Sequence, residues 1–130
     1  MMQGSAAISW TRRGDVTVVM FNESRLTGKS HAVHANIELR YVARKANGRV
    51  LLDLSNVEFI STVFLAVLIE FSRAIRAAGG SLKICGVSPL LTGIMRLCST
   101  LSLFDIYGTE KEALEAFHAL EGHPIPAMVG

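Results

Sequence analysis

Residues 49–78 constrain the fold more than any other part of the sequence. Residues 49–54 read RVLLDL, a short apolar run without alternation, which is typical of a strand covered on both faces. The helix expected at about 61–78 is almost entirely apolar in its first half, and its polar positions share one narrow face. Both elements must therefore be deeply buried, at the centre of a layered α/β domain.

Other strands and helices alternate around this centre. Strands are expected at 6–11, 15–21, 81–85 and 103–107, and a first helix runs from Ser30, its expected cap, to about Ala46. In that helix Val33, Ile37 and Tyr41 recur at every fourth position and predict the buried stripe.

Two further helices are expected. Ser88 and Pro89 open the third helix, and its apolar side is formed by Leu90, Leu91, Ile94, Leu97 and Cys98. A capping box at 109–112 opens the fourth. The pattern predicts an α/β fold with a mixed, mostly parallel sheet of four to five strands, an N-terminal antiparallel edge and about four helices.

Length and charge narrow the function classes. The 130 residues suit one domain, expected at 1–121, followed by a flexible tail at 122–130. The net charge of +2 comes with no basic stripe, which argues against nucleic acid as a partner. The longest apolar run, Val63–Ile69, is shorter than the roughly 20 residues that span a membrane. With no signal-like segment at the N-terminus, we expect a cytoplasmic protein that does not bind membranes.

No set of residues predicts catalysis, a metal or a cofactor. Asp53 ends a strand without a second acid or base nearby, so we expect it to cap the following loop. Cys85 and Cys98 lack metal spacing and are expected to be small buried residues. His31 and His34 have no ligand companion in sequence and are expected to be solvated. We therefore expect a non-enzymatic protein.

The hydroxyl pair Ser61-Thr62 is the local feature with functional potential. It stands where a loop meets the buried helix, so the simplest interpretation is an N-cap. A helix start also offers free N–H groups and a partial positive charge, which would stabilise a phosphoryl group. Such a group would bring negative charge onto an apolar patch and repel a docked partner.

The order of short motifs over Val50–Phe117 resembles the STAS family. These are Asp53-Leu54, Gly79-Gly80, Ser88-Pro89, Leu103–Tyr107 and Glu112–Leu114. The resemblance implies an α/β regulatory domain that binds another protein. In members that act as anti-sigma-factor antagonists, a kinase anti-sigma factor phosphorylates a hydroxyl at the start of the second helix, directly after an Asp.

The resemblance also implies site residues. Ser61 stands at the position of the family's Asp, Thr62 at that of the phosphorylated hydroxyl, and Val63 at that of a second hydroxyl. Phe64 and Ala66 replace two glycines. The implied partner is a serine/threonine kinase-type anti-sigma factor, the implied phosphorylation site is Thr62 with Ser61 as the fallback, and the implied contact residues are Ile60, Ser61, Thr62, Val63 and Phe64.

Two alternatives stay open at this point, and so does a homodimer. In the first, the domain is a constitutive scaffold or assembly subunit, with an exposed Phe64 as the anchor of its interface. In the second, it carries a small apolar ligand or lipid in a pocket between the buried helix and the sheet.

Overall fold

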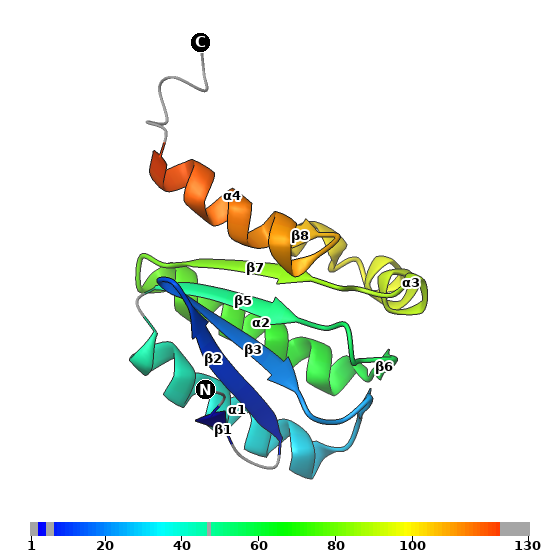
Figure 1. The fold of residues 1–130 in the computed structure, drawn as a ribbon. Coiled ribbons are helices and arrows are strands. Elements are labelled where there is room, and N and C mark those ends of the chain that lie inside the picture. The colour runs from blue at the N-terminus through cyan, green and yellow to red at the C-terminus, as the bar shows by residue number, and fades with distance from the viewer. Residues whose placement is uncertain (1–2, 5–6, 47, 123–130) are drawn as a thin grey trace.

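The computed structural model describes residues 3–4, 7–46 and 48–122. Of the tail expected at 122–130, Gly122 belongs to the last helix instead, and residues 123–130 lie outside the described ranges. Six strands form one sheet in the order β1-β2-β3-β5-β7-β8 (Figure 1). Their bounds are β1 Gln3–Gly4, β2 Ile8–Arg13, β3 Val16–Phe21, β5 Arg49–Asp53, β7 Ser81–Cys85 and β8 Ile106–Tyr107. The β1-β2 and β2-β3 pairs are antiparallel and the other three are parallel.

This architecture confirms the predicted mixed sheet with an antiparallel N-terminal edge and four helices. The sheet has six strands instead of the expected four to five. The additional strand is β1, whose two residues are too few to leave a periodic signal in the sequence.

The helices cover both faces of the sheet. Helices α1 (Lys29–Lys45) and α2 (Thr62–Ala77) lie on one face, and α4 (Glu110–Gly122) lies on the other (Figure 1). Helix α3 (Pro89–Leu97) follows β7 and contacts the short strand β6 (Phe59–Ile60), and the 3-10 helix η1 (Leu101–Leu103) follows α3.

Strand alternation divides the core between these layers. On β3, Val16 and Val18 belong to the cluster that includes Phe117 of α4, whereas Val19 and Phe21 belong to the larger cluster under α1 and α2. Successive side chains of a strand point to opposite faces, so a strand that is apolar at every position must be covered on both. The prediction that the strand at 49–54 is covered on both faces is confirmed, because Leu51 belongs to the cluster under α4 whereas Val50 and Leu52 belong to the larger cluster.

Helix α1 differs from its prediction in two respects. Its N-cap is Gly28, with no side-chain cap, so the expected cap at Ser30 is wrong. The expected buried stripe of Val33, Ile37 and Tyr41 faces outward instead. The buried residues are Ala32, Ala35, Leu39 and Val42. Small alanines let two helices approach closely, and α1 packs against α2.

Helix α3 is capped as predicted but turned. The Ser88 side-chain oxygen accepts a hydrogen bond from the Leu91 N–H at 3.1 Å. Leu91 and Met95 are the buried residues, while Leu90, Leu97 and Cys98 are exposed. The predicted apolar side was therefore only partly correct, and Cys98 is not a buried cysteine.

The turn between α2 and β7 needs its second glycine for space. A Cβ on Gly80 would lie 2.5 Å from the carbonyl oxygen of Gly48. This contact brings the starts of β5 and β7 together, and the Ser81 N–H donates to the same carbonyl at 2.6 Å.

Candidate functional site

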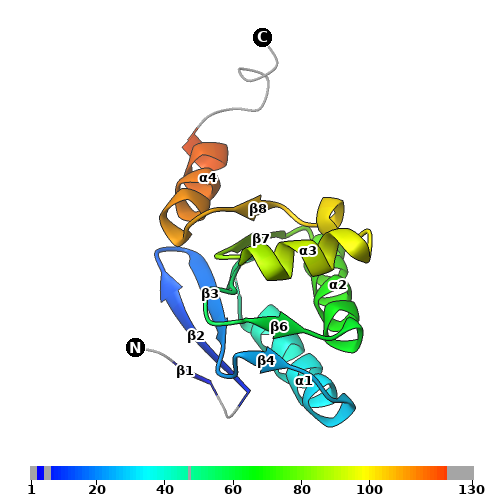
Figure 2. The same cartoon turned by 90° about the vertical axis from the view of Figure 1, so that its right-hand side faces the viewer.

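The segment that leads into α2 is fixed by backbone hydrogen bonds. Strand β6 pairs in parallel with β4 (Arg25–Leu26), forming a separate two-stranded sheet (Figure 2). The Ser61 N–H donates to the Leu26 carbonyl at 2.9 Å, and the Glu58 N–H donates to the Ser24 carbonyl at 2.7 Å. The Arg25 guanidinium also lies 4.7 Å from the centre of the Phe59 ring. The start of α2 is thus held in place by the paired strands β4 and β6.

Ser61 is the N-cap of α2. Its backbone is extended, and its Oγ accepts a hydrogen bond from the Phe64 N–H at 3.3 Å. One of the free N–H groups of the first turn is satisfied in this way. The prediction that the hydroxyl pair supplies a cap is confirmed, and Ser61 is the residue that does so.

Thr62, the first residue of α2, is exposed. Its hydroxyl has no hydrogen-bond partner among the residues that the structure describes. Val63 is next to it and is 41% exposed. The tip of α2 therefore presents one hydroxyl beside one apolar side chain, and both are accessible to another protein.

Ile60 and Phe64, the other two expected contact residues, are buried. Each is 2% exposed. The Phe64 ring packs edge-on against Phe21, with 6.4 Å between the ring centres and 82° between the planes. Long side chains in a helix point back toward its N-terminus, which carries this ring beneath the first turn. The expectation of an exposed Phe64 anchor is wrong, and any docking at this tip falls to Ser61, Thr62 and Val63.

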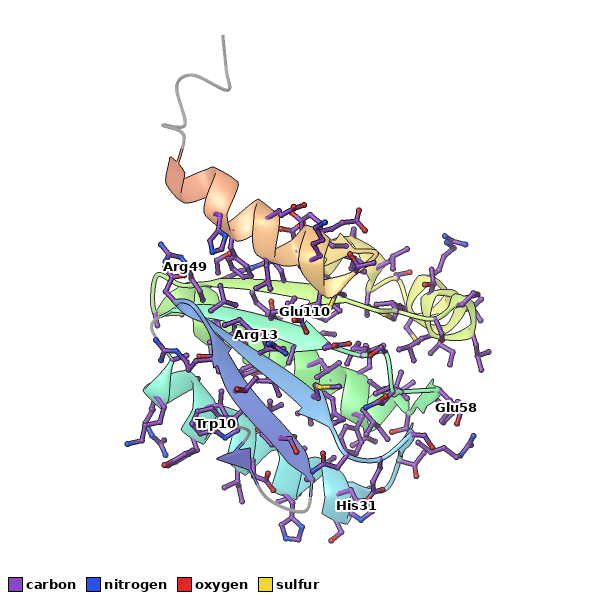
Figure 3. All side chains as sticks on the ribbon, viewed as in Figure 1. Trp10, Arg13, His31, Arg49, Glu58 and Glu110 are labelled. Carbon is purple, nitrogen blue, oxygen red and sulfur yellow. The ribbon has the colours of Figure 1, made fainter. Side chains whose placement is uncertain are left out.

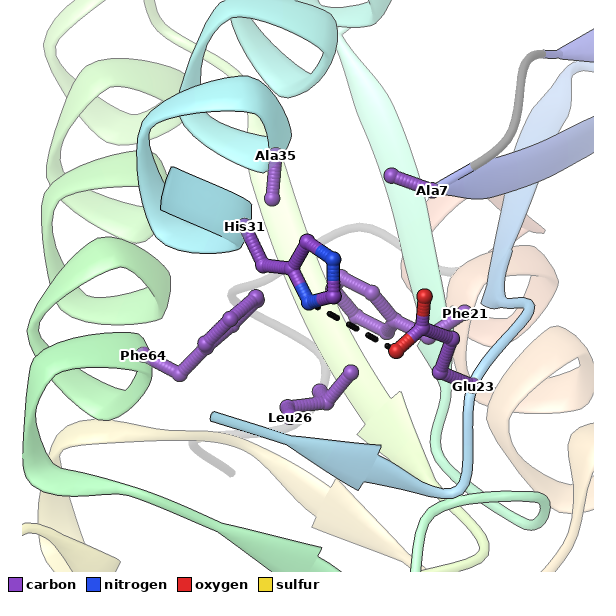
Figure 4. A pocket seen from close by; sticks show the side chains of 7 residues that line it. All are labelled: Ala7, Phe21, Glu23, Leu26, His31, Ala35 and Phe64. Atoms are coloured by element: carbon purple, nitrogen blue, oxygen red, sulfur yellow. Dashed lines mark ion pairs between the residues drawn. The ribbon is translucent and has the colours of Figure 1, made fainter. Parts of the chain in front are cut away.

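A shallow recess lies beside the Phe64 ring (Figure 4). It is lined by Ala7, Phe21, Glu23, Leu26, His31, Ala35 and Phe64. The space in it that a water-sized group can occupy is about 10 Å³, which is room for about one water molecule. His31 Nδ1 lies 3.6 Å from a Glu23 carboxylate oxygen at its edge. The recess therefore gives no support to the lipid-carrier alternative.

The other residues singled out in the sequence have structural explanations. The Asp53 carboxylate accepts a hydrogen bond from the Ser55 N–H at 2.9 Å, which confirms its predicted role in the loop. Burial raises the pKa of the Cys85 thiol to about 12, with Asp53 and Glu110 adding to the effect. His31 and His34 are exposed as predicted (His31 in Figure 3). Within the described ranges, no cluster of potential metal ligands occurs.

Lys83 is a buried charge that the sequence analysis did not single out. Its side chain is 3% exposed and its Nζ lies 2.5 Å from an Asp105 carboxylate oxygen. The same Nζ is about 5 Å from the ring centres of Tyr107 and Phe117. A lysine in an SLKIC strand gives no sequence signal of this arrangement, because its partners follow more than 20 residues later.

A comparison with protein families identifies the family of this chain. The family described as the STAS domain matches residues 7–113 of this chain. The chain belongs to the STAS domain family. The match includes the α2 tip and extends into α4, so the resemblance predicted from the sequence is confirmed.

Relatives of this STAS domain include regulatory proteins. The Bordetella bronchiseptica protein BtrV, named as a candidate anti-sigma factor antagonist, is 26% identical over 92 residues, which cover 71% of this chain and 79% of BtrV. An anti-sigma-factor antagonist (STAS) domain protein from Planctomyces limnophilus is 27% identical with a TM-score of 0.76, over 87% of this chain and 98% of that structure.

The fold is also that of the Bacillus cell-fate determinant SpoIIAA in its phosphorylated form. The TM-score is 0.62 at 16% identity, over 85% of this chain and 99% of that structure. In addition, none of the helices in the described parts of this STAS domain is long and apolar enough to cross a membrane.

Proposed function

We propose that this STAS domain is a regulatory module that binds a serine/threonine kinase-type anti-sigma factor through the tip of α2, and that phosphorylation of Thr62 weakens this binding. The observation that carries the proposal is that two neighbouring hydroxyls differ in their contacts. Ser61 is engaged in the helix cap, whereas Thr62 is exposed and makes no hydrogen bond within the described residues.

The relatives support both parts of the proposal. BtrV is named as a candidate anti-sigma factor antagonist, which is the class of protein that binds an anti-sigma factor. SpoIIAA, which shares the fold, has a phosphorylated form. A protein of this architecture can therefore carry a phosphate and keep its fold.

The chemistry of the tip explains why a phosphate would act as a switch. At the start of a helix, N–H groups and the helix dipole stabilise negative charge, so phosphorylated Thr62 would be tolerated by the domain itself. A phosphate carries about 1.5 to 2 negative charges at neutral pH. It would stand beside the exposed Val63, where an apolar contact with a partner would otherwise form, and it would resist the loss of water that docking requires.

The test combines phosphorylation with binding. The domain is incubated with ATP and the kinase-type anti-sigma factor of its own organism, and phosphate is located by intact and peptide mass spectrometry. We expect one phosphate on Thr62, none in Thr62→Ala, and unchanged phosphorylation in Ser102→Ala, which removes an exposed hydroxyl elsewhere.

Binding is then measured by calorimetry. Thr62→Glu and Val63→Asp are expected to weaken the complex, while Ser102→Ala is not. Phosphate on Ser61 instead of Thr62 would move the acceptor to the fallback residue. Full-strength binding by Thr62→Glu together with the absence of phosphate would refute the switch.

A further inference from the structure

The outward face of α1 carries a row of exposed apolar side chains. Val33 is 57% exposed, Ile37 61% and Tyr41 47%. Residues four apart lie on one ridge of a helix, so these three form a continuous strip. Single exposed apolar residues are common on protein surfaces, but a contiguous strip indicates an interaction site.

Positive charge is concentrated on the same helix. Helix α1 has four Lys or Arg residues and one acidic residue, Glu38, whereas the rest of the chain has nine basic and ten acidic residues. Arg40, Arg44 and Lys45 are all exposed. The Lys45 Nζ lies 5.6 Å from the centre of the Tyr41 ring, so a cation stands directly at the end of the strip.

The two arginines form a second ridge beside the first. Helical spacing places Arg40 and Arg44 next to Ile37 and Tyr41. The Arg40 Nε donates a hydrogen bond to the Asn36 side-chain oxygen at 3.2 Å, which holds the guanidinium along the helix. The face thus consists of an apolar ridge of Val33, Ile37 and Tyr41 and a parallel cationic ridge.

The charge pattern of this face indicates which kind of molecule can bind to it. A second copy of the domain docked through the same face would oppose like charges, which is unfavourable at an interface. A helix that lies on a membrane inserts a broad apolar face, whereas α1 buries its broader apolar side in the domain and leaves three residues outside. An apolar ridge flanked by carboxylates on another protein complements both features of α1.

We propose that the outward face of α1 is a second docking surface, and that its occupant is an acidic amphipathic helix of a partner protein. The inner side of α1 packs on α2, so the outward face is a surface separate from the residues at the α2 tip. This inference does not rest on the function proposed for Thr62.

The test uses two synthetic helical peptides with the same leucine ridge. One has glutamates beside the leucines and the other has lysines. Binding to the full chain is measured by fluorescence anisotropy, and the site is located by amide chemical-shift changes. We expect the glutamate peptide to bind on α1 and the lysine peptide to bind at least tenfold more weakly.

Variants test the two ridges separately. Ile37→Asp is expected to weaken the glutamate peptide about 30-fold, as loss of a central contact does. Arg40→Glu combined with Arg44→Glu is expected to reverse the preference toward the lysine peptide. The matched control, Arg12→Glu with Arg96→Glu, changes the net charge equally at exposed positions outside α1 and is expected to keep the preference. Circular dichroism confirms that each variant is folded.

Three results would overturn the proposal. These are no binding of the glutamate peptide, equal binding of both peptides, and shift changes that map outside α1. Binding to anionic phosphatidylglycerol vesicles that exceeds peptide binding and disappears in the arginine double variant would assign the face to lipid instead. Thr62→Glu is expected to leave peptide binding unchanged, so this proposal and the phosphorylation switch can fail separately.

Discussion

Replacing Phe64 by alanine tests whether the α2 tip is built on the core. The side chain is 2% exposed and packs edge-on against Phe21. Phe→Ala changes in cores lower the free energy of unfolding by about 3 to 5 kcal/mol. The ring also lines a recess that is partly open to solvent, and water that enters the vacated space would reduce the cavity cost. We therefore expect a loss of about 3 kcal/mol, the lower end of that range.

The assays are urea and thermal unfolding, both followed by circular dichroism. For a domain of this size, the expected loss corresponds to a melting temperature lower by about 10 °C, with an unchanged dependence on urea. Val63→Ala is the matched control, because Val63 is the adjacent exposed residue, and its change is expected to stay within about 0.5 kcal/mol. A Phe64→Ala domain as stable as the control would show that the ring is a surface group and that our account of the tip is wrong.

Other substitutions and pH probe the interior and the cap. Thr17→Val is expected to raise the free energy of unfolding by about 1 to 2 kcal/mol, because the Thr17 hydroxyl is buried without a partner in the described part of the chain. Urea titration measures this change, and a lower free energy of unfolding in the variant would contradict the prediction. Ser61→Ala is expected to lower the free energy of unfolding by about 1 kcal/mol or less, because the cap hydrogen bond is long at 3.3 Å. Thermal unfolding measures this change, with Ser102→Ala as the control. The pKa of Cys85 rises from 9.0 to about 12 on folding. Its contribution to stability is therefore complete below about pH 9 and is lost as the pH rises toward 12, so Cys85→Ala should flatten the decline in stability over that interval.

The layered fold could be predicted because its signals are strong. The uninterrupted apolar strand at 49–54 and the long apolar helix after it can be buried only between other layers. The turn at Gly79-Gly80 and the cap at Ser88 also mark their boundaries clearly. By contrast, β1, β4 and β6 have two residues each, and no periodicity can be read from two residues.

The orientation of α1 could not be predicted from periodicity. The helix has two apolar stripes, and the larger residues Val33, Ile37 and Tyr41 suggested the wrong one. The buried stripe includes Ala32 and Ala35, which contribute little hydrophobicity but allow close contact with a neighbouring helix. Which stripe faces inward depends on the distance to α2, and a single sequence does not contain that distance.

The helix start that carries the hydroxyl pair was predicted in position, but its contacts were not. Ser61 and Thr62 lie at an accessible helix start, as the sequence suggested. The division of roles between them depends on the Ser61 cap, and the burial of Phe64 depends on Phe21, a residue far away in the sequence. Contacts of this kind arise only once the strands and helices are assembled.

The pairing of β4 with β6 makes the shape of the α2 tip independent of most of its side chains. The bonds from Glu58 and Ser61 to the Ser24–Leu26 segment are made by main-chain atoms, which nineteen of the twenty amino acids can provide in the donor position. The exposed side chains of Thr62 and Val63 can therefore change in chemistry, for example from a hydroxyl to a carboxylate, while these main-chain bonds keep the backbone in place. Proline at position 58 or 61 would remove one of these bonds, because proline has no backbone N–H to donate.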